Sequence, residues 1–216
     1  MEITVIIADD HAIIREGLKS LLEKKGIRVL DIARNGREAV EMAIAMEPTV
    51  MMMDISMPDL NGVEATARIK RQVPHTKIIA LSMHSSKTNI DKMFAAGASG
   101  YILKESAFSE LYDAIQQVVA GNFYLTPSIA RMYMDSQGGP FSNHDQIPKF
   151  NKISIKEREI LQLVTEGEKT RDIAEKLNVS IKTVETHRRN IMKKLNIFSV
   201  AGLTKFAIKE GIITLE

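Results

Sequence analysis

Residues 49–62 read TVMMMDISMPDLNG. An unbroken apolar run, Val50–Met53, is followed directly by Asp54 and then by Pro58 and Gly62, which interrupt regular structure. A strand that is apolar at every position is buried on both faces, which is typical of a parallel sheet covered by helices on each side. The stretch therefore predicts an inner strand of an α/β sandwich that ends in a carboxylate.

Strand-length and helix-length apolar patterns alternate on both sides of this run, from residue 4 to residue 120. Right-handed crossovers between successive parallel strands make this a doubly wound five-stranded parallel sheet. The predicted strands are Thr4–Ala8, Ile27–Ile32, Val50–Met53, Lys77–Leu81 and Tyr101–Leu103. The predicted helices are one that carries residues 13–22, then Arg37–Met46, Val63–Arg71, Lys87–Ala96 and Ala107–Ala120.

The pattern changes twice beyond the α/β domain of residues 1–125. Residues 126–150 contain prolines and a Gly-Gly-Pro sequence among polar residues, so they are predicted to be a linker, in which Ser128–Met134 can form a short helix. Residues 151–216 are predicted to be a small all-α domain of four helices, each opened by a capping residue. These predicted caps are Ser154, Thr170, Ser180 and Ser199.

The length, cysteine content and charge of the chain limit the kinds of protein that it can be. A chain of 216 residues suits two domains, and the absence of cysteine excludes disulfides and thiolate metal sites. The net charge of +2 is uneven, because residues 151–216 hold 13 basic and 9 acidic side chains. A basic excess in a small domain suits a polyanion. The N-terminus lacks a signal-peptide pattern and no run approaches the roughly 18 apolar residues of a membrane span, so we predict a cytoplasmic protein with no membrane partner.

Three carboxylates follow predicted strands: Asp9 and Asp10 after the first, and Asp54 after the third. In a doubly wound sheet the carboxyl ends of the strands form the ligand crevice, so these acids are expected to converge. Clustered carboxylates repel one another unless they are protonated or neutralised by a hard cation, and oxygen ligands of this kind suit Mg²⁺. The alternative is that Asp9 and Asp10 only cap the next helix.

Ser82 and Lys104 end the fourth and fifth strands at the same rim. A carboxylate beside a metal, a hydroxyl and an ammonium group is suited to a phosphoryl group, with Asp54 as the nucleophile. Aspartyl-phosphate chemistry also serves phosphatases and transport ATPases, so an enzyme is the competing class. Against it, the sequence shows no second carboxylate placed as general acid or base beside Asp54, and no glycine-rich phosphate loop.

Residues 1–120 resemble a response regulator receiver domain, which has a flavodoxin-like fold. The resemblance rests on the order and spacing of Ala8–His11, Met53–Pro58 with Asn61–Gly62, Leu81–Ser82 and Tyr101–Lys104. It implies that Asp54 accepts a phosphoryl group from a sensor histidine kinase, with self-catalysed transfer and hydrolysis but no other enzymatic activity. It also implies that Asp9, Asp10, Asp54 and the backbone carbonyl of Ser56 hold Mg²⁺.

The same resemblance implies a switch. Ser82 would bond the phosphoryl oxygen and Lys104 would pair with it, while Tyr101 would change rotamer as the Ser82 hydroxyl moves. Tyr101 can equally be an ordinary half-buried strand residue. Many receivers have proline after the lysine, whereas this chain has Glu105.

A helix-turn-helix pattern lies in the C-terminal domain, where Arg171–Leu177 and Ser180–Leu195 flank a turn at Asn178–Val179. The second helix carries Lys182, Glu185, Thr186, Arg189 and Lys193 at spacings of three and four, which gives one polar, mostly cationic face. Such a face can bind phosphates and base edges of double-stranded DNA. A solvated helix with a charged outer face is the alternative.

Residues 151–216 resemble a LuxR-type helix-turn-helix domain, through residues 154–161, Gly167, Asp172–Ala174, Ser180–Arg188 and Asn190–Leu195. With the receiver, this is the architecture of a NarL/FixJ-type two-component response regulator. The resemblance implies base contacts from Lys182, Glu185, Thr186 and Arg189, and contacts to the DNA backbone from Thr183 and other exposed Lys and Arg side chains. It further implies a homodimer through the last helix, and phosphorylation that unmasks the recognition helix to regulate transcription. DNA binding independent of phosphorylation is a third hypothesis.

Overall fold

The computed structural model describes residues 2–83, 85–135 and 153–213. The chain divides into two compact units, Met1–Asp145 and Gln146–Glu216, and each is described by itself. Within the described ranges, no helix is both long enough and apolar enough to span a membrane. Most of the predicted linker, from residue 136 to residue 150, lies outside the described residues.

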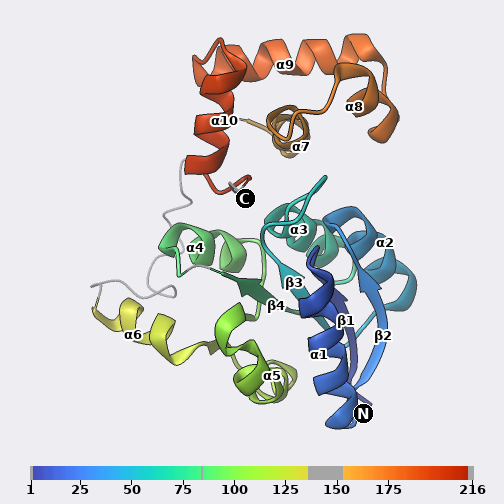
Figure 1. The fold of residues 1–216 in the computed structure, drawn as a ribbon, viewed down its shortest axis with the longest axis vertical. Helices are drawn as coiled ribbons and strands as arrows, with labels where there is room; N and C mark the ends of the chain where they lie inside the picture. Colours follow the sequence, from blue (N-terminus) through green and yellow to red (C-terminus); the bar gives the residue numbers. More distant parts are fainter. Residues whose placement is uncertain (1, 84, 136–152, 214–216) are drawn as a thin grey trace. The chain divides into compact units, whose positions relative to one another are not determined.

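A parallel sheet forms the centre of the N-terminal unit (Figure 1), with the strand order β2-β1-β3-β4-β5-β6. The strands are β1 (Thr4–Ala8), β2 (Arg28–Ala33), β3 (Val50–Asp54), β4 (Lys77–Ser82), β5 (Gly100–Leu103) and β6 (Tyr124–Leu125). All neighbouring strands pair in parallel. The predicted doubly wound parallel fold is confirmed, and the order of its first five strands is that of flavodoxin-like proteins.

The helices cover both faces of this sheet because successive strand residues point to opposite sides. In β3, Met51 and Met53 belong to one buried cluster, while Val50 and Met52 belong to the other. The first cluster receives residues of α2 (Gly36–Met46), α3 (Gly62–Gln72) and α4 (Lys87–Ala95). The second receives residues of α1 (Ala12–Lys24) and α5 (Lys104–Val119).

The sheet has a sixth strand, β6, so the prediction of five strands is wrong. β6 pairs with β5 through Gly100 and Tyr124 and through Tyr101 and Leu125, and so extends the sheet. A strand of two residues has no periodicity that a sequence pattern can detect. It leads into α6 (Pro127–Asp135), the short helix predicted inside the linker, and α6 packs Ile129 into the same buried cluster as Tyr101.

The C-terminal unit contains α7 (Ile155–Thr165), α8 (Thr170–Lys176), α9 (Ile181–Leu195) and α10 (Val200–Lys209) around one apolar core. Ser154 and Glu157 form the predicted capping box at α7, and Ser180 and Ser199 cap α9 and α10. The predicted cap of α8 is wrong, because Lys169 is the N-cap and Thr170 is already helical. The Thr170 hydroxyl instead accepts a hydrogen bond from Arg188 Nη1 at 2.8 Å.

Candidate functional site

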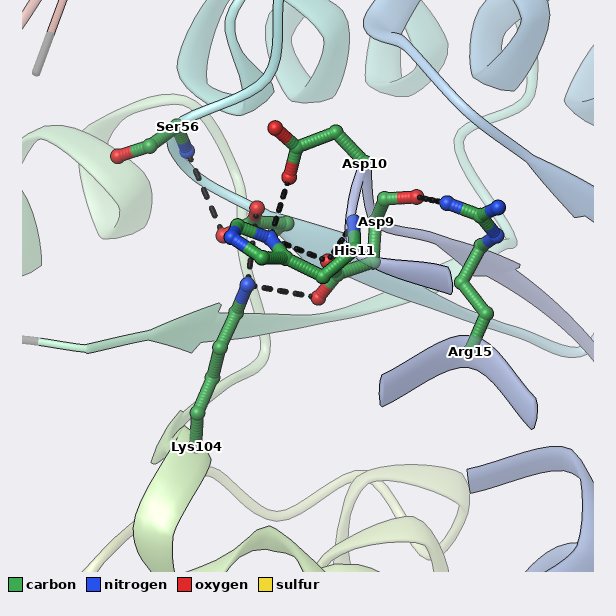
Figure 2. Close-up of polar contacts among 7 residues, drawn as sticks. Asp9, Asp10, His11, Arg15, Ser56 and Lys104 are labelled. Carbon is green, nitrogen blue, oxygen red and sulfur yellow. Dashed lines mark hydrogen bonds and ion pairs between the residues drawn. The ribbon is translucent and has the colours of Figure 1, made fainter. Parts of the chain in front are cut away.

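Lys104 joins two buried carboxylates at the C-terminal edge of the sheet (Figure 2). Its Nζ lies 2.7 Å from Asp9 Oδ2 and 3.0 Å from Asp54 Oδ2. Asp9, Asp54 and Lys104 are 0%, 2% and 4% exposed, so solvent screens these contacts little. The structure therefore brings together three of the residues that the sequence analysis selected.

The order of the strands explains why these residues meet. β1 and β3 are neighbours, and Ala8 pairs with Met53, so the residues that follow the pair are the two acids. Lys104 comes directly after β5 and is the first residue of α5. The predicted start of this helix, Ala107, is therefore wrong, and the helix N-terminus itself carries the ammonium group.

The loop after Asp54 folds back tightly against it. Asn61 Oδ1 caps α3 by accepting from the Glu64 N–H at 3.0 Å, and the Gly62 N–H donates to the Ile55 carbonyl at 2.9 Å. A β-carbon on Gly62 would lie 2.0 Å from the Asp54 carbonyl oxygen, so only glycine fits. This loop also carries Ser56, whose N–H donates to Asp54 Oδ1 at 3.4 Å.

His11 and Arg15 also contact the acids, although the sequence analysis gave neither a role. His11 Nδ1 lies 2.7 Å from Asp10 Oδ1 and 3.1 Å from Asp9 Oδ1. Arg15 donates to the Asp9 carbonyl at 2.7 Å (Figure 2). His11 was marked in the sequence only as the last residue of the receiver-like segment Ala8–His11, and no sequence pattern marked Arg15.

Burial and the ion pairs of Lys104 act in opposite directions on the pKa values of Asp54 and Lys104. Burial, reinforced by the neighbouring Asp9 carboxylate, raises the pKa of Asp54 to about 6, although Lys104 opposes the rise. Burial by itself lowers the pKa of Lys104, but its attraction to Asp54 and Asp9 outweighs that effect and leaves the pKa raised. Lys104 therefore remains an ammonium ion at neutral pH, and Asp54 is mainly ionised there.

Ser82 and Tyr101 lie on the adjacent strands β4 and β5 and are both buried. Burial raises the pKa of Tyr101 to about 12, a hydrogen bond with Ser82 opposes that rise, and the Asp54 charge adds to it. The two hydroxyl groups are thus partners within reach of the Asp54 charge. Tyr101 is fully buried rather than half-buried.

The acids form a group of potential metal ligands. One ligand atom each from Asp9, Asp10, His11 and Asp54 lies within 4.8 Å of the others. Within the described residues, Asp9 Oδ2, Asp10 Oδ1 and Asp54 Oδ2 are buried without a hydrogen bond of good geometry. Asp9 Oδ2 and Asp54 Oδ2 contact the Lys104 ammonium group, and Asp10 Oδ1 contacts the His11 ring. Such oxygens suit a hard divalent cation.

A second candidate surface lies on α9 in the C-terminal unit. Lys182, Glu185, Thr186, Arg189 and Lys193 are all exposed, as the helical spacing predicted. Thr183 is half-buried, and its N–H donates to the Ser180 hydroxyl at 3.0 Å as part of the cap. The five exposed residues share a surface that carries three cations and one carboxylate.

A hollow in this surface is lined by Thr170, Glu185, Arg188, Arg189 and Met192. Arg188 and Thr170 were missed by the sequence analysis, because they are 18 positions apart and only the packing of α8 on α9 joins them. Their hydrogen bond fixes the start of α8 beside the polar face of α9. The hollow offers both guanidinium donors and a carboxylate acceptor at one place.

Comparison with known proteins agrees with both halves of this description. Residues 5–116 match the response regulator receiver domain, and residues 151–207 match the luxR family of bacterial regulatory proteins. The chain belongs to the NarL/FixJ-type response regulators. This response regulator therefore consists of a receiver domain and a LuxR-type domain, and it is not a classical enzyme.

Several relatives align with nearly the whole chain. The response regulator is 37% identical to response regulator UvrY of Escherichia coli K12 over 215 residues, which cover 99% of this chain and 97% of the relative. It is 36% identical to oxygen regulatory protein NreC of Staphylococcus carnosus, with 97% and 98% covered. A solved RcsB–DNA complex aligns with a TM-score of 0.58 and 27% identity, covering 95% of this chain and 98% of RcsB.

Proposed function

We propose that Asp54 accepts a phosphoryl group from the phosphohistidine of a sensor kinase, and that this modification controls dimerisation and sequence-specific DNA binding to regulate transcription. The observation that carries the proposal is the buried contact of Lys104 with both Asp9 and Asp54 at 2.7 and 3.0 Å. It provides a nucleophile, a cation and a neighbouring acid at the end of three strands.

The transfer requires an ionised Asp54. One carboxylate oxygen attacks phosphorus, the bond from phosphorus to the histidine nitrogen breaks, and the nitrogen keeps the electron pair. Lys104 already faces Asp54 Oδ2 and offsets negative charge on the transferring oxygens. Hydrolysis by water returns the carboxylate and phosphate, which is the only turnover that we assign to the receiver domain.

Asp9, Asp10, Asp54 and the Ser56 carbonyl are the residues that would hold Mg²⁺. When bound, this ion neutralises the clustered acids and the phosphoryl oxygens. The three buried carboxylate oxygens without well-formed hydrogen bonds support this assignment. Asp9 and Asp10 would hold the ion, and Lys104 would remain available to pair with the phosphoryl group.

Ser82 and Tyr101 are the proposed switch residues. Transfer places phosphoryl oxygens near the end of β4, where the Ser82 hydroxyl can donate to them. Tyr101 would then lose or remake its hydrogen bond with Ser82, and its ring would respond. This change shifts the receiver domain between two states, which favours dimers on DNA.

The α9 surface is the proposed DNA interface. Lys182, Glu185, Thr186 and Arg189 would face base edges, while Thr183 and Lys193 would contact the sugar-phosphate backbone. The RcsB–DNA complex, aligned over most of this chain, supports the assignment. A two-fold dimer would read half-sites about one helical turn apart.

Phosphorylation by a small-molecule donor such as acetyl phosphate tests the first part of the proposal. Wild-type protein with Mg²⁺ is expected to form an acid-stable, base-labile phosphoprotein, and Asp54→Asn or added chelator is expected to abolish it. Labelling that persists in Asp54→Asn would exclude Asp54 as the acceptor.

Selection of bound fragments from random DNA tests the second part. Beryllofluoride with Mg²⁺ is expected to increase enrichment of a two-fold symmetric site for wild type but not for Asp54→Asn. Equal enrichment for both proteins would instead support DNA binding that is independent of phosphorylation.

A further inference from the structure

Thr126 connects the start of α6 to the end of β5. Its N–H donates to the Tyr101 carbonyl at 3.1 Å, and its Oγ1 accepts from the Leu103 N–H at 3.1 Å. Its carbonyl accepts from the N–H groups of Ile129 and Ala130 at 2.9 and 3.0 Å, in the first turn of α6. Thr126 therefore bonds to both β5 and α6. It lies outside residues 5–116, the region that matches the receiver family.

The two β5 backbone groups that Thr126 contacts, the Tyr101 carbonyl and the Leu103 N–H, lie at or next to residues of the proposed site. Tyr101 is the proposed switch residue, and Leu103 immediately precedes Lys104. Leu103 is also the N-cap residue of α5, and its apolar side chain makes no capping hydrogen bond. The Leu103 N–H is therefore fixed by Thr126 at the point where the chain turns from β5 into the helix that carries Lys104.

The contact is well protected from solvent. Thr126 is 2% exposed, and Ile129 is fully buried beside it in the cluster that contains Tyr101 and Leu103. Two residues earlier, in β6, Tyr124 donates to Glu110 Oε2 of α5 at 3.0 Å. Because β6 is anchored to both β5 and α5, a displacement of Thr126 would be passed to the backbone next to Lys104.

We propose that Thr126 is a positioning residue for phosphoryl transfer: its hydroxyl fixes the Leu103–Lys104 backbone and so holds the Lys104 ammonium group against Asp54. The inference rests on the proposed function of Asp54. It also joins α6, at the beginning of the connection to the DNA-binding domain, directly to the residue before Lys104. A small misplacement of a charge-stabilising group slows a transfer step without preventing the donor from binding.

The test compares full-length Thr126→Val, which removes the acceptor at nearly constant volume, with Thr126→Ser, which retains it. Ser128→Ala, an exposed change in α6, is the matched control. Initial rates of phosphorylation are measured against acetyl phosphate concentration in the presence of Mg²⁺. Thr126→Val is expected to lower the maximal rate about tenfold with little change in KM, whereas the other two variants stay within about twofold of wild type.

A wild-type maximal rate for Thr126→Val, or equal losses for valine and serine, would overturn the inference. If Thr126→Val does not fold, Thr126→Cys replaces it, because its thiol is a weaker acceptor. An intermediate rate for cysteine supports the inference, and a rate equal to that of serine contradicts it.

A second measurement does not depend on phosphorylation. Hydrogen exchange of the Leu103 amide in the unphosphorylated chain is expected to accelerate in Thr126→Val but not in Thr126→Ser, together with a shift of the Lys104 ammonium NMR signal. If wild type takes up no phosphoryl group while these two signals change, the function proposed for Asp54 fails, whereas the placement of Lys104 by Thr126 stands. If neither signal changes, the positioning role fails.

Discussion

Asp54 is an acid in surroundings that oppose its ionisation. Burial and the Asp9 carboxylate raise its pKa from 3.8 to about 6, and Lys104 only partly opposes them. Between these two values the folded state binds more protons than the unfolded state, so the stability of the receiver domain falls as pH rises through this window. Above about pH 6 Asp54 is ionised, and the whole free-energy cost of its buried charge lowers the stability of the receiver domain.

Asp54→Asn is therefore expected to stabilise the receiver domain at pH 7 but not at pH 4. Without divalent cations, the difference in unfolding free energy between variant and wild type should grow by up to about 3 kcal/mol across that range. Urea denaturation at several pH values measures it, and Asp113→Asn, at an exposed position, serves as the control. A difference that does not depend on pH would show that Asp54 is not destabilised by its charge.

Gly62 determines where the Asp54 backbone can lie. In Gly62→Ala the added methyl group would meet the Asp54 carbonyl oxygen at 2.0 Å, and backbone cannot move aside as a flexible side chain can. We expect a loss of at least about 1–3 kcal/mol in unfolding free energy, together with slower phosphorylation. Gly17→Ala is the control, because its methyl group meets only the half-exposed Phe108 ring. Equal effects of both changes would contradict this explanation.

At the scale of helices and strands, the accuracy of sequence reasoning followed the strength of the local signal. The buried run of β3 was recognised because burial on both faces leaves no polar position. β6 was missed because two residues have no period, and its contacts with β5 come from a tertiary pairing. Thr170 was assigned as a cap by residue type, whereas its hydroxyl bonds to Arg188, 18 residues further along the chain.

The acidic site shows the same division. The positions of Asp9, Asp54 and Lys104 followed from strand ends and topology, which a sequence pattern contains. The contacts of His11 and Arg15 depend on the direction in which the first turn of α1 leaves β1. The role inferred for Thr126 depends on a strand that the pattern could not reveal.

The capping box of α7 also connects two helices. Glu157 Oε2 accepts from the Ser154 N–H and from Lys194 Nζ of α9, both at 2.7 Å. Burial by itself raises the pKa of Glu157, but Lys194 and the Ser154 backbone outweigh it and leave the pKa lowered. A lowered folded-state pKa means that this stabilisation is present above the unfolded value of 4.5 and is lost as pH falls through the folded value.

Glu157→Gln is accordingly expected to destabilise the C-terminal unit by roughly 1–3 kcal/mol at pH 7 and by progressively less as pH falls below the unfolded value of 4.5. Thermal unfolding followed by circular dichroism checks this. Glu168→Gln removes an ion pair of the same length, 2.7 Å, but the Glu168 side chain is 28% exposed whereas that of Glu157 is 4% exposed, so a much smaller loss is expected. A Glu157→Gln effect that is as small as the Glu168→Gln effect would disprove the bridging role.

The cations of the α9 surface predict how the affinity for duplex DNA changes with salt concentration. Lys193 is exposed at the C-terminal end of the polar face, where we assign it to phosphate rather than to a base. Lys193→Ala should weaken binding to all duplexes similarly and reduce the slope of log affinity against log salt by about one. Lys24→Ala, at an exposed position on α1 of the receiver domain, is the control, and fluorescence anisotropy at several salt concentrations gives the slopes. An unchanged slope would remove Lys193 from the interface.

At the scale of the whole molecule, the two units have separate apolar cores. An effect of phosphorylation in one unit on DNA binding by the other is therefore described as a coupling between two binding equilibria. If beryllofluoride with Mg²⁺ raises operator affinity by some factor, then operator DNA must raise beryllofluoride affinity by the same factor at equal protein concentration. A coupling of 1–3 kcal/mol corresponds to a factor of roughly 5–150.

Titrating beryllofluoride with and without operator, and operator with and without beryllofluoride, measures both factors independently. We expect equal factors above about five for wild type, and factors near one for Asp54→Asn, because it lacks the carboxylate that takes the phosphoryl analogue. Thr126→Val should lower both factors together if the contact with Leu103 also transmits the state of the receiver domain to α6. Factors near one for the wild type would mean that the phosphorylated receiver domain does not control DNA binding, whatever the affinity of α9 for DNA.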